Sequence, residues 1–121
     1  MRILTILLIM FFCIGSFYEA GAELPEEYDT QRLCYAIFKA EGGYTAQYLY
    51  GIRSIPYKNM LDARKICINT IENNKERFYN QSKYGDYLDF LASRYCPIGA
   101  ENDPQGLNRH WIKNVRYYYN K

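Results

Sequence analysis

The sequence predicts a mainly α-helical single domain, with about four helices and one small non-helical lobe after the first helix. In four separate stretches, apolar residues recur every three or four positions, the spacing that places them on one face of a helix. Clusters of Gly, Pro, Asn and Asp separate these stretches. The chain has no internal repeat and no long linker, so we expect one hydrophobic core rather than two.

The first 22 residues have the pattern of an export signal. Arg2 supplies a positive charge, 3–14 is almost wholly apolar, and the small residues at 20–22 offer a cleavage site. The apolar run is short for a membrane span. We therefore expect a cleaved signal peptide at 1–22, a domain at 23–121 and no stable membrane span after cleavage. The expected location is exported, periplasmic or secreted; an uncleaved N-terminal anchor is the alternative.

The first helix has clear signals at both ends. Asp29 or Thr30 can cap its start, and we expect it to extend to about Glu41. Gly42-Gly43 then end the helix, because glycine readily adopts the conformation that a helix C-terminus requires. Its apolar stripe consists of Leu33, Cys34, Ile37 and Phe38.

Residues 44–57 follow with no helical period. Their apolar and aromatic side chains alternate as in short strands, with Gly51 as a turn or bulge and Pro56 near the end. The sequence leaves two forms open for this lobe, a small β-hairpin or an irregular segment.

Three further helices are predicted after the lobe. The longest covers about 60–79, and Asp86 is a natural N-cap for a short helix at 87–95. A loop rich in Gly, Pro, Asn and Asp occupies 98–106, and the last helix runs over about 107–119.

Composition argues against several function classes. The basic residues of the C-terminal part are concentrated in 109–121, which is too small a patch to indicate nucleic-acid binding. Cys34, Cys67 and Cys96 match no zinc-binding spacing, and His110 is the only histidine. We therefore expect no metal, no cofactor and no nucleic-acid partner, disfavour a cysteine hydrolase, and expect a monomer. One disulfide is possible, but three cysteines leave at least one thiol free and the sequence assigns no pairing.

Glu41 is the candidate catalytic residue. It follows Leu33 and Ile37 on one helix row, so we expect it to point toward the core side. A helix C-terminus and apolar neighbours both disfavour the charged carboxylate, which should raise its pKa and suit a general acid. Arg53 would lower that pKa if a turn brought it back to Glu41. The alternative interpretation is a solvent-exposed glutamate before a glycine cap.

Tyrosine is unusually common, with 13 of the 14 tyrosines after residue 22. Aromatic faces stack on sugar rings, and phenol hydroxyls bond sugar hydroxyls. We therefore expect a sugar-binding cleft, although most of these rings could instead pack with their hydroxyls at the surface. The candidate substrate-binding residues are Tyr44, Tyr48, Tyr50, Asn108, His110 and Trp111.

The absence of a second acidic residue near Glu41 in the sequence restricts the type of glycosidic cleavage. Hydrolysis normally needs two carboxyl groups, and no acidic residue occurs between Glu41 and Asp62. A lytic transglycosylase needs a single acid and base, because the 6-hydroxyl of the substrate itself closes an anhydro ring. The missing second carboxyl group therefore favours the transglycosylase reaction.

Two short motifs carry a family resemblance. Glu41-Gly42-Gly43-Tyr44 followed by Tyr50-Gly51-Ile52 resembles the phage-type peptidoglycan glycosidases, and more broadly the lysozyme-like superfamily with its soluble lytic transglycosylases. The resemblance implies a lysozyme-like fold in which a helix delivers Glu41, the catalytic acid, to a cleft lined by the glycine turn. The partner it implies is the glycan strand of peptidoglycan.

Two hypotheses from different classes remain. The first is an exported peptidoglycan lytic transglycosylase or muramidase in which Glu41 is acid and then base. The second is a non-catalytic exported lysozyme-like module that binds cell-wall glycan or a protein partner. The short spacer at 45–49 and the missing second acid favour the module, whereas the presence of Glu41 favours the enzyme.

Overall fold

The computed structural model describes residues 28–81 and 85–121, and within them the protein is mainly α-helical. Three short 3-10 turns, Gly43–Thr45 (η1), Leu49–Gly51 (η2) and Leu107–His110 (η3), join the helices. The four helices are α1 (Thr30–Ala40), α2 (Met60–Gln81), α3 (Tyr87–Tyr95) and α4 (Trp111–Asn120). This confirms the prediction of a mainly α chain with four helices. The signal peptide predicted at 1–22 lies outside the described residues.

The lobe between α1 and α2 takes the irregular form. Residues 44–57 are all described and contain η1 and η2 but no strand, so no β-hairpin forms. Left-handed backbone at Gly42, Gly43, Tyr50 and Gly51 explains this, because strands need extended conformations on both sides of a turn.

Helix α1 begins and ends as its sequence predicts. The Asp29 side chain accepts a hydrogen bond from the backbone N–H of Arg32 at 2.7 Å, which caps the helix. Glu41 is the C-cap residue, and Gly42 then turns the chain with φ = +110°. The helix therefore stops with the Glu41 side chain at its last turn.

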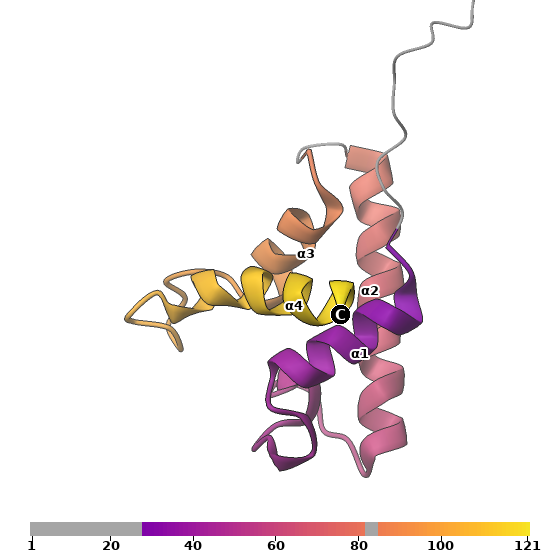
Figure 1. The fold of residues 1–121 in the computed structure, drawn as a ribbon, viewed down its shortest axis with the longest axis vertical. Helices are drawn as coiled ribbons and strands as arrows, with labels where there is room; N and C mark the ends of the chain where they lie inside the picture. Colours follow the sequence, from indigo (N-terminus) through magenta and orange to yellow (C-terminus); the bar gives the residue numbers. More distant parts are fainter. Residues whose placement is uncertain (1–27, 82–84) are drawn as a thin grey trace, which may run out of the picture.

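Helices α1 and α4 pack side by side and antiparallel, and α1 crosses α2 (Figure 1). At one end, the backbone N–H of Asp29 donates to the Tyr119 hydroxyl at 3.0 Å. At the other end, the first residue of α4, Trp111, reaches Glu41. This antiparallel arrangement brings the start of α4 to the end of α1.

The core lies between the helices, where α1 and α3 each pack against both α2 and α4. Burying each of its large apolar side chains stabilises the fold by roughly 1.5–3 kcal/mol. The fully buried aliphatic members are Leu33, Ile37, Ile71, Leu88, Leu91 and Val115. Within the described residues, no helix is long and apolar enough to cross a membrane.

The last predicted helix, 107–119, is divided into η3 and α4. Asp103 explains the tight first turn, because its carboxylate accepts hydrogen bonds from the backbone N–H groups of Leu107 at 2.7 Å and Asn108 at 3.1 Å. The same carboxylate accepts from the N–H of Gly99 at 3.1 Å. These three bonds fold the segment between α3 and α4 into a compact loop beside the end of α1.

Candidate active site

Glu41 and Trp111 form the contact on which the site is built. The indole Nε1–H of Trp111 donates to Oε1 of Glu41 at 2.8 Å, joining residues far apart in the chain. The Trp111 side chain is only 6% exposed, so its position is fixed by packing. The bond orients the carboxylate and leaves its second oxygen, Oε2, without a donor from Trp111.

Gly51 also lies close to the Glu41 carboxylate. A Cβ atom added to Gly51 would lie 2.6 Å from Cδ of Glu41 and 2.8 Å from both carboxylate oxygens, so any larger residue would displace the carboxylate. Its backbone is left-handed, with φ = +69°. The backbone of this turn therefore touches the acid directly.

Tyr50, the residue before Gly51, is also left-handed, with φ = +57°, and it is the one such non-glycine residue in the described parts of the chain. Its ring is 5% exposed and packs against Phe38 at a centroid distance of 5.2 Å. The Tyr95 hydroxyl donates to the Tyr50 carbonyl oxygen. Buried packing and this hydrogen bond hold a strained conformation beside Glu41, and such strain is concentrated at functional sites in proteins.

The electrostatic surroundings of Glu41 favour its protonated form. Burial raises the pKa of the carboxyl group, whereas the Trp111 hydrogen bond and the positive charge of Arg53 lower it. Burial is the largest effect, so the pKa lies above the usual glutamate value. The predicted direction is confirmed, and the opposing effect of Arg53 is present but smaller.

The carboxylate faces an open pocket of about 240 Å³ at the junction of η2, α3 and the loop that Asp103 folds. Glu41 is the one carboxylate among its described lining residues. The lining residues are Glu41, Gly51, Arg53, Ser54, Tyr95, Cys96, Pro97, Asn102 and Asn108. Among all the residues that the structure describes, no group of three or more His, Cys, Asp or Glu residues is arranged to hold a metal ion.

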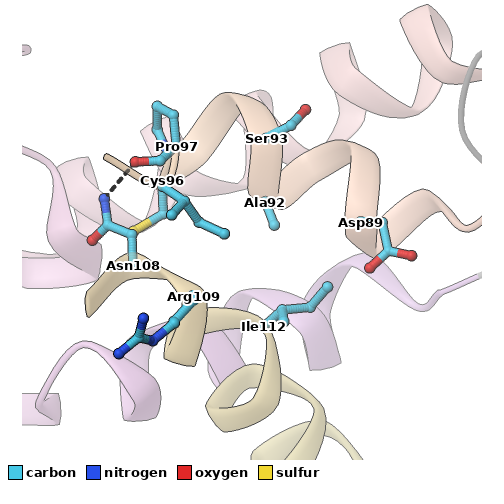
Figure 2. A pocket seen from close by; sticks show the side chains of 9 residues that line it. Asp89, Ala92, Ser93, Cys96, Pro97, Asn108, Arg109 and Ile112 are labelled. Carbon is cyan, nitrogen blue, oxygen red and sulfur yellow. Dashed lines mark hydrogen bonds between the residues drawn. The ribbon is translucent and has the colours of Figure 1, made fainter. Parts of the chain in front are cut away.

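Three of the residues predicted to bind substrate are close to Glu41. Trp111 bonds the carboxylate, and Asn108 lines the pocket with its Nδ2 donating to the Pro97 carbonyl oxygen at 2.8 Å (Figure 2). Tyr50 is close to Glu41 only through its strained backbone. Its ring is buried in the core. A ring in that position has no face free for a sugar.

The other three predicted residues do not line the Glu41 pocket. Tyr44 is 79% exposed, packs edge-on against Phe38 and lines a separate pocket with residues of α1 and α2. Tyr48 does not line the pocket, although the guanidinium of the lining residue Arg53 lies 5.1 Å from the centre of its ring. His110 is exposed on η3 and lines none of the described pockets.

Sequence reasoning missed several residues of the pocket wall. Tyr95 stacks on Trp111 with 5.3 Å between ring centroids, so it supports the ring that bonds Glu41. Ser54, Cys96 and Asn102 also line the wall. The available signal was the Cys96-Pro97 helix end followed by a polar turn, since loops on a rigid scaffold often carry functional groups.

A cysteine nucleophile is disfavoured by the surroundings of Cys96. Burial, with the negative charges of Glu41 and Asp103, raises the pKa of its thiol to about 11. A thiol with this pKa remains protonated at neutral pH, whereas a nucleophilic cysteine needs the thiolate. Cys34 and Cys67 are buried in the core, away from the pocket lining.

Two further pockets adjoin the Glu41 pocket. One, between η2, α2 and α3, shares Gly51, Arg53, Ser54 and Tyr95 with it. The other, between α3 and the start of α4 (Figure 2), shares Cys96, Pro97 and Asn108. The two outer pockets have no described lining residue in common, so the Glu41 pocket lies between them.

Comparison of the chain with protein-family models, curated proteins and solved structures finds no match. The geometry of the site is therefore the basis for a functional proposal.

Proposed function

We propose that this protein is an exported, monomeric peptidoglycan-cleaving glycosidase of lysozyme-like fold that acts as a lytic transglycosylase, with Glu41 as its single acid and base. One observation carries the proposal. A partly buried carboxyl group with a raised pKa faces an open pocket whose described lining holds no second carboxylate. This is the arrangement that one-acid cleavage of a glycosidic bond requires.

The reaction follows from two proton transfers at Glu41. The protonated carboxyl group gives its proton to the bridging oxygen as the bond from that oxygen to the anomeric carbon breaks. The resulting carboxylate then takes the proton of the substrate's 6-hydroxyl while that oxygen bonds to the anomeric carbon. Glu41 ends protonated, the sugar ends as a 1,6-anhydro ring, and no water is consumed.

The neighbours of Glu41 suit both steps. Burial favours the proton-carrying form that begins the reaction, and Trp111 and Arg53 stabilise the anion that forms midway. Trp111 bonds Oε1, which leaves Oε2 to transfer the proton. Gly51 lies against the same carboxyl group and limits where it can move.

The neighbouring pockets support action within a polymer. A chain cleaved in its middle must lie on both sides of the acid, and pockets adjoin the Glu41 pocket on two sides. Polar groups from Arg53, Ser54, Asn102 and Asn108 are available there for sugar hydroxyls.

The direct test is product analysis on purified peptidoglycan by chromatography and mass spectrometry. We expect soluble fragments that end in 1,6-anhydro sugars, and none from Glu41→Gln. Glu101→Gln is the matched control, because Glu101 is an exposed carboxylate of the loop after α3 and lies outside the pocket lining.

Other results would change the proposal. Reducing ends in place of anhydro ends would indicate a hydrolase. Equal products from the protein and from Glu41→Gln would remove Glu41 from the mechanism. Binding to peptidoglycan with no product from either would select the non-catalytic binding module.

A further inference from the structure

Cys34 and Cys67 form a pair of free thiols inside the core. Cys34 belongs to α1 and Cys67 to α2, and the two residues are only 1% and 0% exposed. Their side chains hydrogen-bond to each other where α1 crosses α2 (Figure 1). Two residues far apart in the chain therefore have neighbouring sulfur atoms, which is the first condition for a disulfide between them.

The two thiols differ in their surroundings. The hydrogen bond from Cys67 lowers the pKa of the Cys34 thiol, and the positive charge of Arg64 outweighs burial together with it. The same hydrogen bond, with burial, raises the pKa of the Cys67 thiol. Cys34 therefore holds the thiolate and Cys67 keeps its proton, the division between an attacking cysteine and the resolving cysteine that completes a disulfide.

Cys34 also has a route to solvent. It lines a pocket of about 300 Å³ between α1 and α2, and it is the one cysteine among the described lining residues. Tyr35, Phe38 and Met60 provide apolar and aromatic wall, and Arg64 provides a positive charge. Because Cys34 is almost fully covered, a reagent that reaches it through this pocket must be as small as a hydroperoxide.

Cys96 is a natural comparison within the same chain. It lines the Glu41 pocket and lies outside the lining of the pocket that holds Cys34. Burial, with the charges of Glu41 and Asp103, raises the pKa of its thiol to about 11. This thiol remains protonated at neutral pH and should react slowly with an oxidant.

We propose that Cys34 and Cys67 are a redox site that reacts with hydroperoxides through this pocket and forms a disulfide joining α1 to α2. The Cys34 thiolate attacks one oxygen of hydrogen peroxide, the O–O bond breaks, and Cys34 becomes a sulfenic acid as hydroxide leaves. The Cys67 sulfur then attacks the Cys34 sulfur, the S–O bond breaks, and water leaves with the Cys67 proton. Two thiols and one peroxide give one disulfide and two waters, so the sulfurs are oxidised and the peroxide is reduced.

The disulfide would connect two side chains that support the Glu41 site. The Tyr50 hydroxyl bonds the Cys34 side chain, and the Tyr95 hydroxyl lies 3.9 Å from Sγ of Cys67. Tyr95 also bonds the Tyr50 carbonyl oxygen and stacks on Trp111. The proposed bond therefore fixes α1 and α2 behind both tyrosines, and its formation does not depend on the reaction proposed for Glu41.

The test follows each thiol of the folded, reduced protein after addition of equimolar hydrogen peroxide. Free thiols are alkylated, and the peptides are identified by mass spectrometry without reduction. We expect one disulfide, Cys34–Cys67, and loss of these two thiols about tenfold faster than loss of Cys96, which lacks a thiolate. Oxidation should raise Tm by on the order of 10 °C and reduction should reverse the change, because the bond closes a loop in the unfolded chain.

Three variants separate the two steps. In Cys67→Ala, Cys34 should stop at the sulfenic acid, which dimedone traps, because the resolving thiol is absent. In Cys34→Ala, Cys67 should stay reduced. Cys96→Ala is the control and should form the disulfide at an unchanged rate.

A disulfide that includes Cys96 would overturn the inference, as would three thiols that stay free for alkylation in excess peroxide. A Tm lowered by oxidation would overturn it too, because the bond would then form only by distorting the fold. Peptide mapping uses the unaltered chain, so these outcomes are decided whether or not the alanine variants fold.

Discussion

Two carboxylates in the same region of the molecule, Glu41 and Asp103, have opposite pKa shifts. Burial raises the pKa of Glu41, and one side-chain donor and one cation offset this only in part. Burial also acts to raise the pKa of Asp103, but the N–H groups of Gly99, Asn108 and Leu107, with the charge of Arg109, lower it below the usual value. The number of hydrogen-bond donors and nearby cations explains why the pKa values of these two buried carboxyl groups shift in opposite directions.

The two carboxylates also differ in what they face. The Glu41 carboxylate contacts the Trp111 indole, lies close to Gly51 and opens onto a pocket. Asp103 is 5% exposed and holds the loop that forms part of the same pocket wall. We therefore expect substitution of Glu41 to change activity and substitution of Asp103 to change the loop.

The largest expected effect is that of Glu41→Gln on turnover. Removing the general acid should lower turnover by about 10²–10⁴-fold, the usual contribution of such a group. The same variant should be slightly more stable at neutral pH, with an increase on the order of a few degrees in Tm, because a disfavoured charge is removed from a buried position. Turnover is measured on peptidoglycan and Tm by calorimetry; lost activity together with a lowered Tm would contradict this assignment.

Gly51→Ala should have the next largest effect. Its Cβ would meet the Glu41 carboxyl group, and the positive φ adds a backbone cost of about 1–2 kcal/mol. We expect at least tenfold lower turnover, because the carboxylate must move. Gly99→Ala is a matched control, since Gly99 has φ = +71° and nothing within 4 Å of an added Cβ. It should lose similar stability with little loss of turnover, and equal losses of turnover in both variants would count against direct contact at Gly51.

Asp103→Asn should loosen the loop and leave the Glu41 carboxyl group in place. Asparagine has one acceptor oxygen where the carboxylate has two, and it carries no charge, so the three N–H bonds cannot all persist. We expect the amide exchange rates of Gly99, Leu107 and Asn108 to rise about tenfold, measured by hydrogen exchange. Unchanged protection of all three amides would show that the loop does not depend on Asp103.

The smallest effects concern pH. Because its pKa is raised in the folded protein, Glu41 costs folding free energy as pH rises through the usual glutamate value of 4.5, up to its raised pKa. Asp103, with a lowered pKa, adds stability above the usual aspartate value of 3.8 that is lost as pH falls through its folded pKa. Carboxyl-carbon NMR should show the two groups displaced in opposite directions, and displacement in the same direction would refute the comparison.

Arg53→Gln sharpens the pH prediction. It removes a charge that lowers the Glu41 pKa, so that pKa should rise further. The fall of activity at high pH should move to higher pH with it, because the acid must carry its proton to act. Lys65→Gln, an exposed lysine of α2, is the control and should leave the profile unchanged. If the activity profile of Arg53→Gln moved to lower pH instead, Arg53 would act on Glu41 mainly through the place that its side chain occupies and not through its charge.

The sequence by itself determined the local features. The spacing of apolar residues predicted all four helices, because a helix face repeats every three to four residues. Gly42 predicted the end of α1 and therefore the place of Glu41 at a helix terminus. These features depend on neighbours within a few residues, which a single sequence displays directly. The direction of the Glu41 pKa shift was also predicted, but its largest cause is burial, which the tertiary structure supplies.

Only the tertiary structure decided how the site is assembled. The bond from Trp111 to Glu41 requires α4 to lie antiparallel beside α1, and that arrangement follows from many side chains packing at once. The same packing buries the Tyr50 ring, turns Tyr44 outward and lets Asp103 fold the loop. Helix periodicity carries no information about which helices meet or at what register. The pocket around Glu41 therefore comes from contacts between residues that are distant in the chain.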